Sequence, residues 1–353
     1  VLTLGRTSFG IRSLAIGTVI GTLGMIVIQF PGLRDVHLRL NFHFRHPAIK
    51  QILALYLPIF VGLISNMVAL IIDRNLAWGI GEYALAAMRY GTTLNQLILG
   101  LVATATSLAA LPTLSRHFAN RDEQAFQRVL SNGIKMVTIL VVPATFGLAA
   151  IAWPTVDLLF FHGATTQGGA HATLIALLAY LPGTFFAAFD QVLIFTYYAR
   201  HNTRTPVIVG VLAVGVYLVF ALTLIHPFGM AGLVLANSAQ FIFHGLVMWW
   251  LVRRLLGPTH AFDHTVARTL RVSLLVGLAM AGIVFVLAKG LEMASLGPLT
   301  SINLLHRLIV VALPIVVGAV IYLGGLHLFG VDEVGMLTRG VKQKLGLRPG
   351  VSS

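Results

Sequence analysis

Long apolar runs recur along the chain, separated by short stretches that hold most of its charged and turn-forming residues. A helix of about 20 apolar residues is needed to cross roughly 30 Å of hydrocarbon. Backbone polar groups in lipid must be satisfied within the segment, so helices are the economical interpretation. The pattern predicts an all-α polytopic membrane protein with about nine transmembrane helices, near residues 13–30, 51–73, 87–111, 134–160, 174–197, 206–225, 229–252, 272–289 and 307–329.

The stretch 65–116 is apolar enough to cross a bilayer twice, yet it carries several polar residues. A turn is expected at residues 79–82, where Gly79 and Gly81 interrupt the apolar run. A charge inside a membrane costs about 2.5–3.5 kcal/mol on insertion scales, and it usually faces a partner or a water-filled cavity. The stretch therefore predicts a helical hairpin beside a polar cavity, with these side chains at or near membrane depth: Asp73, Arg74, Arg89, Asn95 and Gln96.

Composition supports the membrane assignment. Of the 353 residues, 57% are hydrophobic and only 10% are charged, with a mean hydropathy of +0.89, whereas a soluble domain carries about 25% charged residues. The net charge of +13 raises the possibility of a nucleic-acid partner. However, the basic residues fall in short loops between apolar runs instead of clustering on a polar fold. We therefore expect no nucleic-acid partner.

The basic residues also predict the topology. Eighteen of the 24 Lys and Arg residues lie in or beside the segments after the first, third, fifth, seventh and ninth predicted spans. The loops that begin at Phe161 and His226, on the opposite side, hold none. By the positive-inside rule, the first set of loops and the C-terminus are cytoplasmic, and the chain starts outside. The chain starts at Val1 without an initiator Met, and we expect it to be the later part of a longer protein.

Helical spacing predicts a polar face in the second half of the hairpin. Arg89, Thr93 and Gln96 lie three or four residues apart, so they share one side of a helix. Such a stripe suits a helix that lines a substrate path. A guanidinium is a planar donor of several hydrogen bonds and therefore a good partner for a pyrophosphate. In the alternative interpretation, Arg89 lies near the outer interface and extends towards it.

A second polar face combines Asn66 with Asp73, two turns apart, and Arg74 follows directly. In one interpretation, a buried Asp73 balances Arg89 or binds a coupling cation. In the other, Asp73 and Arg74 are charges near the outer end of the helix that fix the hairpin.

Three further residues are candidates outside the hairpin. Asp190 lies mid-span in the apolar segment FFAAFDQVLIF, where it either faces the bundle interior functionally or links two helices. Arg200 and Arg204 flank the start of the next span on the predicted cytoplasmic side. They either catch a headgroup phosphate or anchor the loop to anionic lipid.

Enzyme and metal chemistry find little support in the sequence. The absence of cysteine excludes disulfides, iron–sulfur clusters and thiolate zinc. His37, His43 and His46 cluster in one segment, but no carboxylate joins them at ligand spacing, so no metal site is expected. No P-loop or nucleophile–base pair is recognisable. We therefore expect neither an enzyme nor a cofactor. Energy is expected from an ion or voltage gradient or from a partner, and whether a monovalent cation is coupled is left open.

Three segments resemble a known family. The runs LIID at residues 70–73 and LNQL at residues 94–97, in the stretch 58–101, are similar to the seventh and eighth helices of the MurJ/MviN lipid II flippases. The run LPTLSR at residues 111–116 is similar to that family's cytoplasmic exit, and YYARHNTRTP at residues 197–206 closely matches its F-Y-A-x-x-D-T-R-T-P loop. The resemblance covers nearly the whole chain.

The resemblance implies part of a two-lobe, fourteen-helix flippase of the multidrug/oligosaccharidyl-lipid/polysaccharide exporter superfamily. On this mapping, residues 1–47 hold the last helix of the N-terminal lobe and a cytoplasmic linker. Residues 48–255 form the C-terminal six-helix lobe, and residues 256–353 add two transmembrane helices and a basic tail. The additional helices of the family form a groove thought to hold the lipid tail.

The implied function is to flip the undecaprenyl-pyrophosphate-linked peptidoglycan precursor, lipid II, across the bacterial cytoplasmic membrane by alternating access. The implied partners are this lipid, other membrane lipids and cell-wall synthesis proteins. Many family members carry a cavity Arg at the position of Thr93, so this chain departs from the pattern. Alternatives are a polysaccharide-repeat or cation-coupled drug exporter of the same superfamily, or a paralogue that acts as a scaffold without transport.

Overall fold

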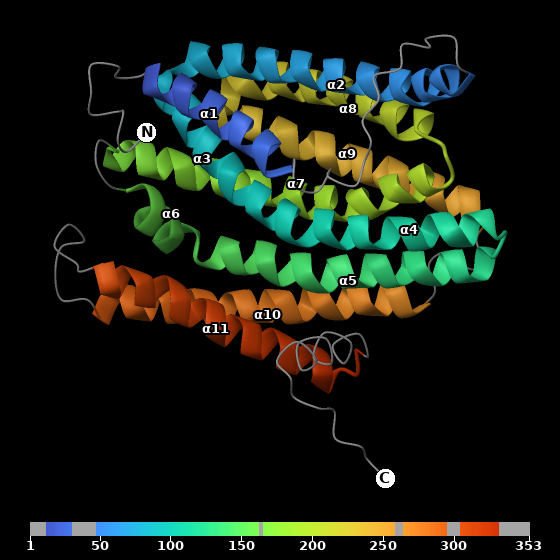
Figure 1. Cartoon of the computed structure of the whole chain (residues 1–353). Coiled ribbons are helices and arrows are strands. Elements are labelled where there is room, and N and C mark those ends of the chain that lie inside the picture. Colours follow the sequence, from blue (N-terminus) through green and yellow to red (C-terminus); the bar gives the residue numbers. More distant parts are fainter. Residues whose placement is uncertain (1–11, 30–46, 162–164, 258–263, 295–303, 332–353) are drawn as a thin grey trace. The chain divides into compact units, whose positions relative to one another are not determined.

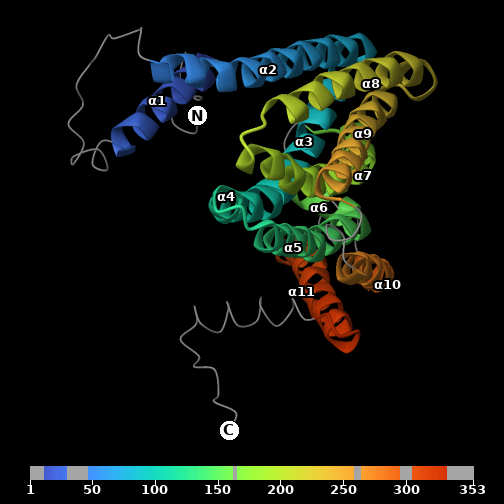
Figure 2. The ribbon, with the colours of Figure 1, turned by 90° about the vertical axis from the view of Figure 1, so that its right-hand side faces the viewer.

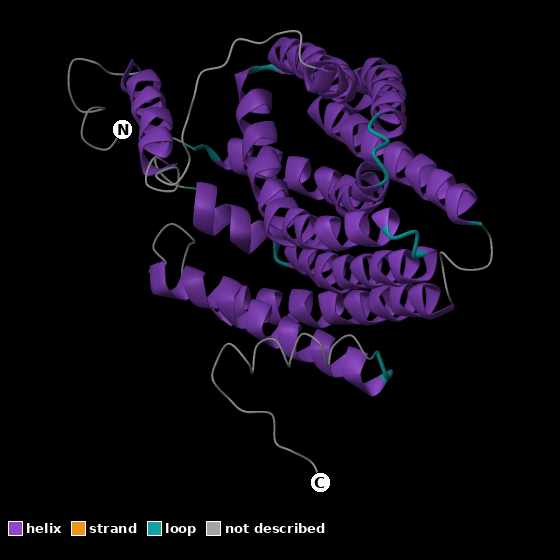
Figure 3. Ribbon diagram, turned by 45° about the vertical axis from the view of Figure 1, so that its right-hand side comes forward, coloured by secondary structure: helices purple, strands orange, loops and turns teal. Residues whose placement is uncertain are grey.

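The computed structural model describes residues 12–29, 47–161, 165–257, 264–294 and 304–331. These residues are almost entirely helical, and no strand occurs among them (Figure 3). The chain divides into two compact units, residues 1–52 and 53–353, and the boundary falls in the first turns of the second helix.

Twelve helical segments follow one another along the described chain. The first five, in the region of the first three predicted spans, are α1 (Arg12–Gln29), α2 (Pro47–Ile80), α3 (Glu82–Ile98), the π-helical segment η3 (Leu99–Thr104) and α4 (Ala105–Ala119). The remaining helices are α5 (Glu123–Ala150), α6 (Ala152–Phe160), α7 (Gln167–Ala199), α8 (Arg204–Phe228), α9 (Met230–Leu256), α10 (His264–Ala294) and α11 (Leu304–Leu328).

The predicted spans agree with these helices. Within the described residues, seven helices are long and apolar enough to cross a membrane, namely α2, α5, α7, α8, α9, α10 and α11. The first predicted span falls on α1, which contributes a shorter apolar helix over Ala15–Gln29. The third falls on α3, η3 and α4, which run on without a break because Leu99 keeps right-handed helical angles. The prediction of an all-α polytopic fold is confirmed.

The turns follow from local chemistry. The predicted turn at residues 79–82 lies between α2 and α3, where Gly81 has φ 148°, an angle that side chains disfavour. The predicted span 134–160 ends earlier than expected, because α5 stops at Ala150 and the short α6 follows. Pro154 sits in the first turn of α6, where its missing N–H is tolerated, but it would break the hydrogen bonding of a continuous helix.

Helix α7 forms the centre of the second unit. It packs against α9 on one side and against α3, α4 and α5 on the other (Figure 1). Helix α8 covers α9, while α10 packs on α5 and α11 packs on α10. Figure 2 shows α10 and α11 beyond α5, on the side away from α8. The last two helices therefore extend the bundle from its α5 side.

Candidate functional site

Helix α3 has two distinct faces. Its buried face packs mainly on α7 and consists of Ala84, Ala87, Met88, Gly91, Leu94, Asn95 and Ile98. Asn95 belongs to this face, and its Oδ1 accepts a hydrogen bond of 2.6 Å from Thr184 of α7. The predicted polar face is the opposite one, since Arg89, Thr93 and Gln96 are all exposed. The second unit therefore presents these three side chains outward.

Arg89 is the cation of this face. Its side chain forms no ion pair with the other residues that the structure describes, and the predicted balance with Asp73 is not seen. The Thr93 hydroxyl donates a 2.9 Å hydrogen bond to the Arg89 carbonyl oxygen, one turn back in the helix. Thr93 thus contributes a small polar surface without charge, and Arg89 supplies the positive charge of this face.

The second predicted face is not a single site. Asn66 is exposed, and its Nδ2 donates to the Gly62 carbonyl at 3.1 Å. Asp73 is half-buried and accepts a 2.7 Å hydrogen bond from the hydroxyl of Tyr217 on α8. Arg74 lies near enough to Asp73 to act on its charge. The Asp73 side chain thus connects α2 to α8, which is a different link from the α2–α3 hairpin considered for it.

Asp190 links helices. Its Oδ2 lies 2.6 Å from Nδ1 of His244 on α9, and both side chains are buried. The Nε2 atom of His244 lies 3.3 Å from the carbonyl oxygen of Pro206, on α8. The pair therefore connects α7, α9 and α8 within the bundle. Sequence reasoning missed His244, although an ionisable side chain in the middle of an apolar run was the same signal that selected Asp190.

The two arginines of the segment 197–206, Arg200 and Arg204, differ in their surroundings. Arg200 pairs with Glu123 at the start of α5, and its guanidinium lies over the rings of Phe118 (5.5 Å) and Phe126 (4.8 Å). These contacts fasten the end of α7 to α4 and α5. Arg204 is exposed at the first position of α8. Of the pair, Arg204 is the more exposed.

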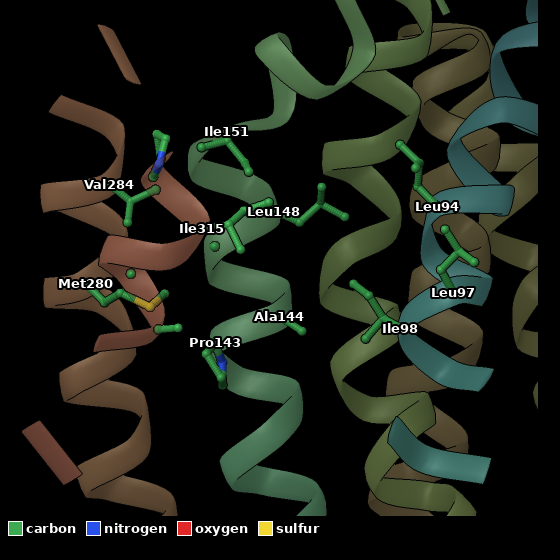
Figure 4. Close-up of a pocket in the computed structure, with 14 residues that line it drawn as sticks. Leu94, Leu97, Ile98, Pro143, Ala144, Leu148, Ile151, Met280, Val284 and Ile315 are labelled. Atoms are coloured by element: carbon green, nitrogen blue, oxygen red, sulfur yellow. The ribbon is translucent and has the colours of Figure 1, made fainter. Parts of the chain in front are cut away.

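An apolar groove of about 380 Å³ lies in the second unit, lined by residues of α3, α5, α10 and α11. In Figure 4 the α5 side chains lie between those of α3 and those of α10. The lining is almost wholly hydrocarbon and comprises Leu94, Leu97, Ile98, Pro143, Ala144, Gly147, Leu148, Ile151, Met280, Val284, Pro314, Ile315, Gly318 and Ala319. Leu97 lines the groove, while the preceding Gln96 belongs to the polar face. The two surfaces therefore meet on α3.

Candidate metal ligands do not gather in the described ranges, where no group of three or more His, Asp or Glu side chains could hold an ion. His37, His43 and His46 lie outside the described residues.

A family model described as "Lipid II flippase MurJ" matches residues 1–306, most of the chain. The chain belongs to the MurJ lipid II flippase family. It is 29% identical over 320 residues to "Probable lipid II flippase MurJ" of Vibrio cholerae, covering 90% of this chain and 60% of that protein. It is 26% identical over 253 residues to "Lipid II flippase MurJ" of Burkholderia cenocepacia, covering 69% of this chain and 48% of that protein. The chain thus spans about half of these MurJ relatives.

Solved structures show the same fold. "Lipid II flippase MurJ, inward closed conformation" superposes with a TM-score of 0.72 at 21% identity, over 94% of this chain and 65% of that one. An outward-facing multidrug resistance MATE family transporter of the MOP superfamily gives a TM-score of 0.51 at 17% identity, over 81% and 66% of the two chains. The predicted superfamily fold is confirmed, and this MurJ family member is a multi-pass membrane protein.

Proposed function

We propose that the protein to which this chain belongs flips the undecaprenyl-pyrophosphate-linked peptidoglycan precursor across the bacterial cytoplasmic membrane, by alternating access. The observation that carries the proposal is the meeting of an apolar groove and an exposed polar face on α3. A lipid with a large polar headgroup needs both surfaces side by side. The tail lies in the groove, where hydrocarbon contact is favourable, while the headgroup follows the polar face.

The headgroup contacts are proposed for Arg89, Thr93 and Gln96. The Arg89 guanidinium offers several charge-assisted hydrogen bonds to a pyrophosphate and stays protonated. Thr93 stands at the position where the family resemblance implies a cavity Arg. Because Arg89 lies one turn away on the same exposed face, it supplies the positive charge that Thr93 lacks.

The remaining parts of the proposal concern topology and coupling. The C-terminus is cytoplasmic, as the distribution of Lys and Arg predicts. Arg204 then lies on the cytoplasmic side, where an exposed basic residue near the surface attracts anionic lipid. Asp73 is engaged by Tyr217, so we assign no residue to a coupling cation.

Complementation of a flippase-depleted bacterial strain tests this function. Wild-type protein is expected to restore growth, whereas Ala144→Trp is expected to abolish rescue because the indole fills the groove. Ala54→Trp is the matched control, since Ala54 is exposed on α2 and is not part of the groove lining. Membrane levels of each protein are measured by immunoblot.

Three outcomes would contradict the proposal. Failure of wild-type protein to rescue growth despite normal membrane levels would contradict the proposed flippase function. Resistance to cationic drugs without rescue would identify an exporter instead. Full rescue by a variant that combines Ala144→Trp with Arg89→Ala would indicate that the protein supports growth as a scaffold, without transport through these surfaces.

A further inference from the structure

A second pocket, of about 560 Å³, opens beside the first turns of α3 and α7. It shares no lining residue with the apolar groove. Its lining includes the aromatic side chains Tyr83 and Tyr90 of α3 and Phe160 of α6, together with Thr165, Thr166 and Thr173. Its volume falls within the range of roughly 300–1,000 Å³ found for small-molecule sites.

The aromatic side chains are presented to the pocket in a fixed arrangement. Tyr83 and Tyr90 lie two turns apart on α3, and both remain exposed, by 54% and 37%. The Tyr90 ring stacks on Phe160 with 4.5 Å between centroids and 19° between planes. The Tyr83 ring lies 3.0 Å from the place that a Cβ on Gly81 would take. The Tyr90 ring is therefore held by stacking on Phe160, and the missing side chain of Gly81 leaves room for the Tyr83 ring.

The threonines of the lining supply hydroxyl groups at the pocket's polar edge. Thr166 is exposed, and its Oγ1 accepts from the Gly169 backbone N–H at 3.2 Å, so its own O–H is available to donate. Thr173 is buried at 1% exposure and donates to the Gly169 carbonyl at 2.9 Å, so Thr165 and Thr166 are the hydroxyl groups that a ligand meets. The described lining contains no charged side chain. The lining therefore suits a neutral ligand with one apolar face and several hydroxyl groups.

A sugar ring has this chemistry, since its C–H face stacks on aromatic rings and its edge carries hydroxyl groups. We propose that this pocket binds a saccharide ring of the precursor's headgroup. The proposal rests on the proposed function, because a peptidoglycan precursor carries sugar. The loop between α6 and α7 holds no Lys or Arg, which predicts the outer side of the membrane. The pocket then receives the sugar after translocation.

Saturation-transfer NMR on the protein in nanodiscs tests the pocket, with N-acetylglucosamine as the probe and sorbitol as an open-chain control. With wild-type protein, saturation is expected to transfer to the ring protons of the sugar but not to the protons of sorbitol. Tyr83→Ala is expected to raise the Kd about tenfold through loss of ring stacking. Tyr83→Phe keeps the ring and is expected to bind as wild type does. Tyr56→Ala removes an exposed tyrosine of α2 and serves as the matched control.

Gly81→Ala gives a second variant, because the added methyl group meets the Tyr83 ring and alanine is strained at a φ of 148°, so both effects displace Tyr83. It is expected to weaken sugar binding as Tyr83→Ala does, while Thr165→Val weakens it by removing a hydroxyl group of the lining. Equal saturation-transfer signals for the sugar and sorbitol, or an unchanged affinity for the sugar in Tyr83→Ala, would contradict sugar binding in this pocket. Rescue of growth without sugar binding would refute this inference alone. Sugar binding without rescue would support the pocket while refuting the proposed function.

Discussion

At the scale of single residues, the polar groups of the bundle divide into those that join helices and those that face outward. Three side chains contact a partner on another helix. They are Asp190 with His244, Asn95 with Thr184, and Asp73 with Tyr217. Arg89 and Gln96 lie on an exposed face. Since a polar group in an apolar interior is costly without a partner, the first set stabilises the bundle. The second set is available to a ligand.

The pair of Asp190 and His244 gives the first prediction. Asp190→Ala leaves His244 without its buried partner, so we expect a loss of about 1–3 kcal/mol in stability. His244→Ala is expected to cost a similar amount, and the double variant should cost less than the two added together. Thermal unfolding of purified protein, monitored by size-exclusion chromatography, measures each loss in stability. Strictly additive losses would show that the two side chains do not interact.

At the scale of helices, close approach depends on small residues at the contacts. Gly183 of α7 lies against Ser238 of α9, where an added Cβ would come within 2.6 Å of the Ser238 Cα atom. Ser238 Oγ also donates a 2.6 Å hydrogen bond to the carbonyl oxygen of Ala179. The two central helices are therefore held together by backbone proximity and by a hydrogen bond, as is typical of membrane bundles.

The second prediction concerns this contact. Gly183→Ala is expected to destabilise the protein by about 1–3 kcal/mol, because the methyl group forces α7 and α9 apart. Gly215→Ala on α8 is the matched control, since nothing lies within 4 Å of its added Cβ. This control should be neutral or slightly stabilising, because alanine favours helix more than glycine does. Thermal unfolding midpoints compare the two variants, and equal midpoints would refute the close approach.

At the scale of the whole second unit, the last helix, α11, is joined to α6 by an ion pair. Arg307 of α11 has its Nε 3.6 Å from Asp157 Oδ2 on α6, and both side chains are largely buried. Helix α6 is not one of the seven candidate spans. Burial raises the pKa of the Asp157 carboxyl above its usual value; the positive charge of Arg307 opposes this shift, and the negative charge of Glu292 adds to it. The neutral form of Asp157 is therefore favoured by folding, and Arg307 offsets the cost of its charge.

The third prediction follows from this pair. Breaking a fully buried ion pair costs about 3–5 kcal/mol, and we expect a smaller loss for Arg307→Gln because Arg307 is partly exposed. Without Arg307 the pKa of Asp157 rises further. The stability lost relative to wild type should therefore be larger at pH 8 than at pH 5, where Asp157 takes up a proton more readily.

Thermal unfolding at the two pH values measures this difference. Arg271→Gln is the control, because Arg271 is exposed on α10 and its Nε donates to the Ala267 carbonyl oxygen of the same helix. It should cost less than about 1 kcal/mol. A loss in Arg307→Gln that is the same at pH 5 and pH 8 would contradict the role given to the Asp157 charge.

Much of the fold was predictable because it depends on local chemistry. An apolar run of sufficient length forms a helix in lipid wherever its neighbours lie, so the predicted spans and the turn at Gly81 agree with the helices. The family was predictable from short runs such as TRTP at residues 203–206. The shared face of Arg89, Thr93 and Gln96 follows from helical spacing alone.

Tertiary structure decided which of these polar residues had partners. Asp190 meets His244 and Asp73 meets Tyr217 across 54 and 144 positions of sequence, and no spacing rule connects residues that far apart. The groove and the tyrosine pocket likewise need side chains from three or more helices. The sequence by itself determined the helices and the faces that each presents. Which faces meet depends on how the helices pack, and packing is set by side-chain shape throughout the bundle.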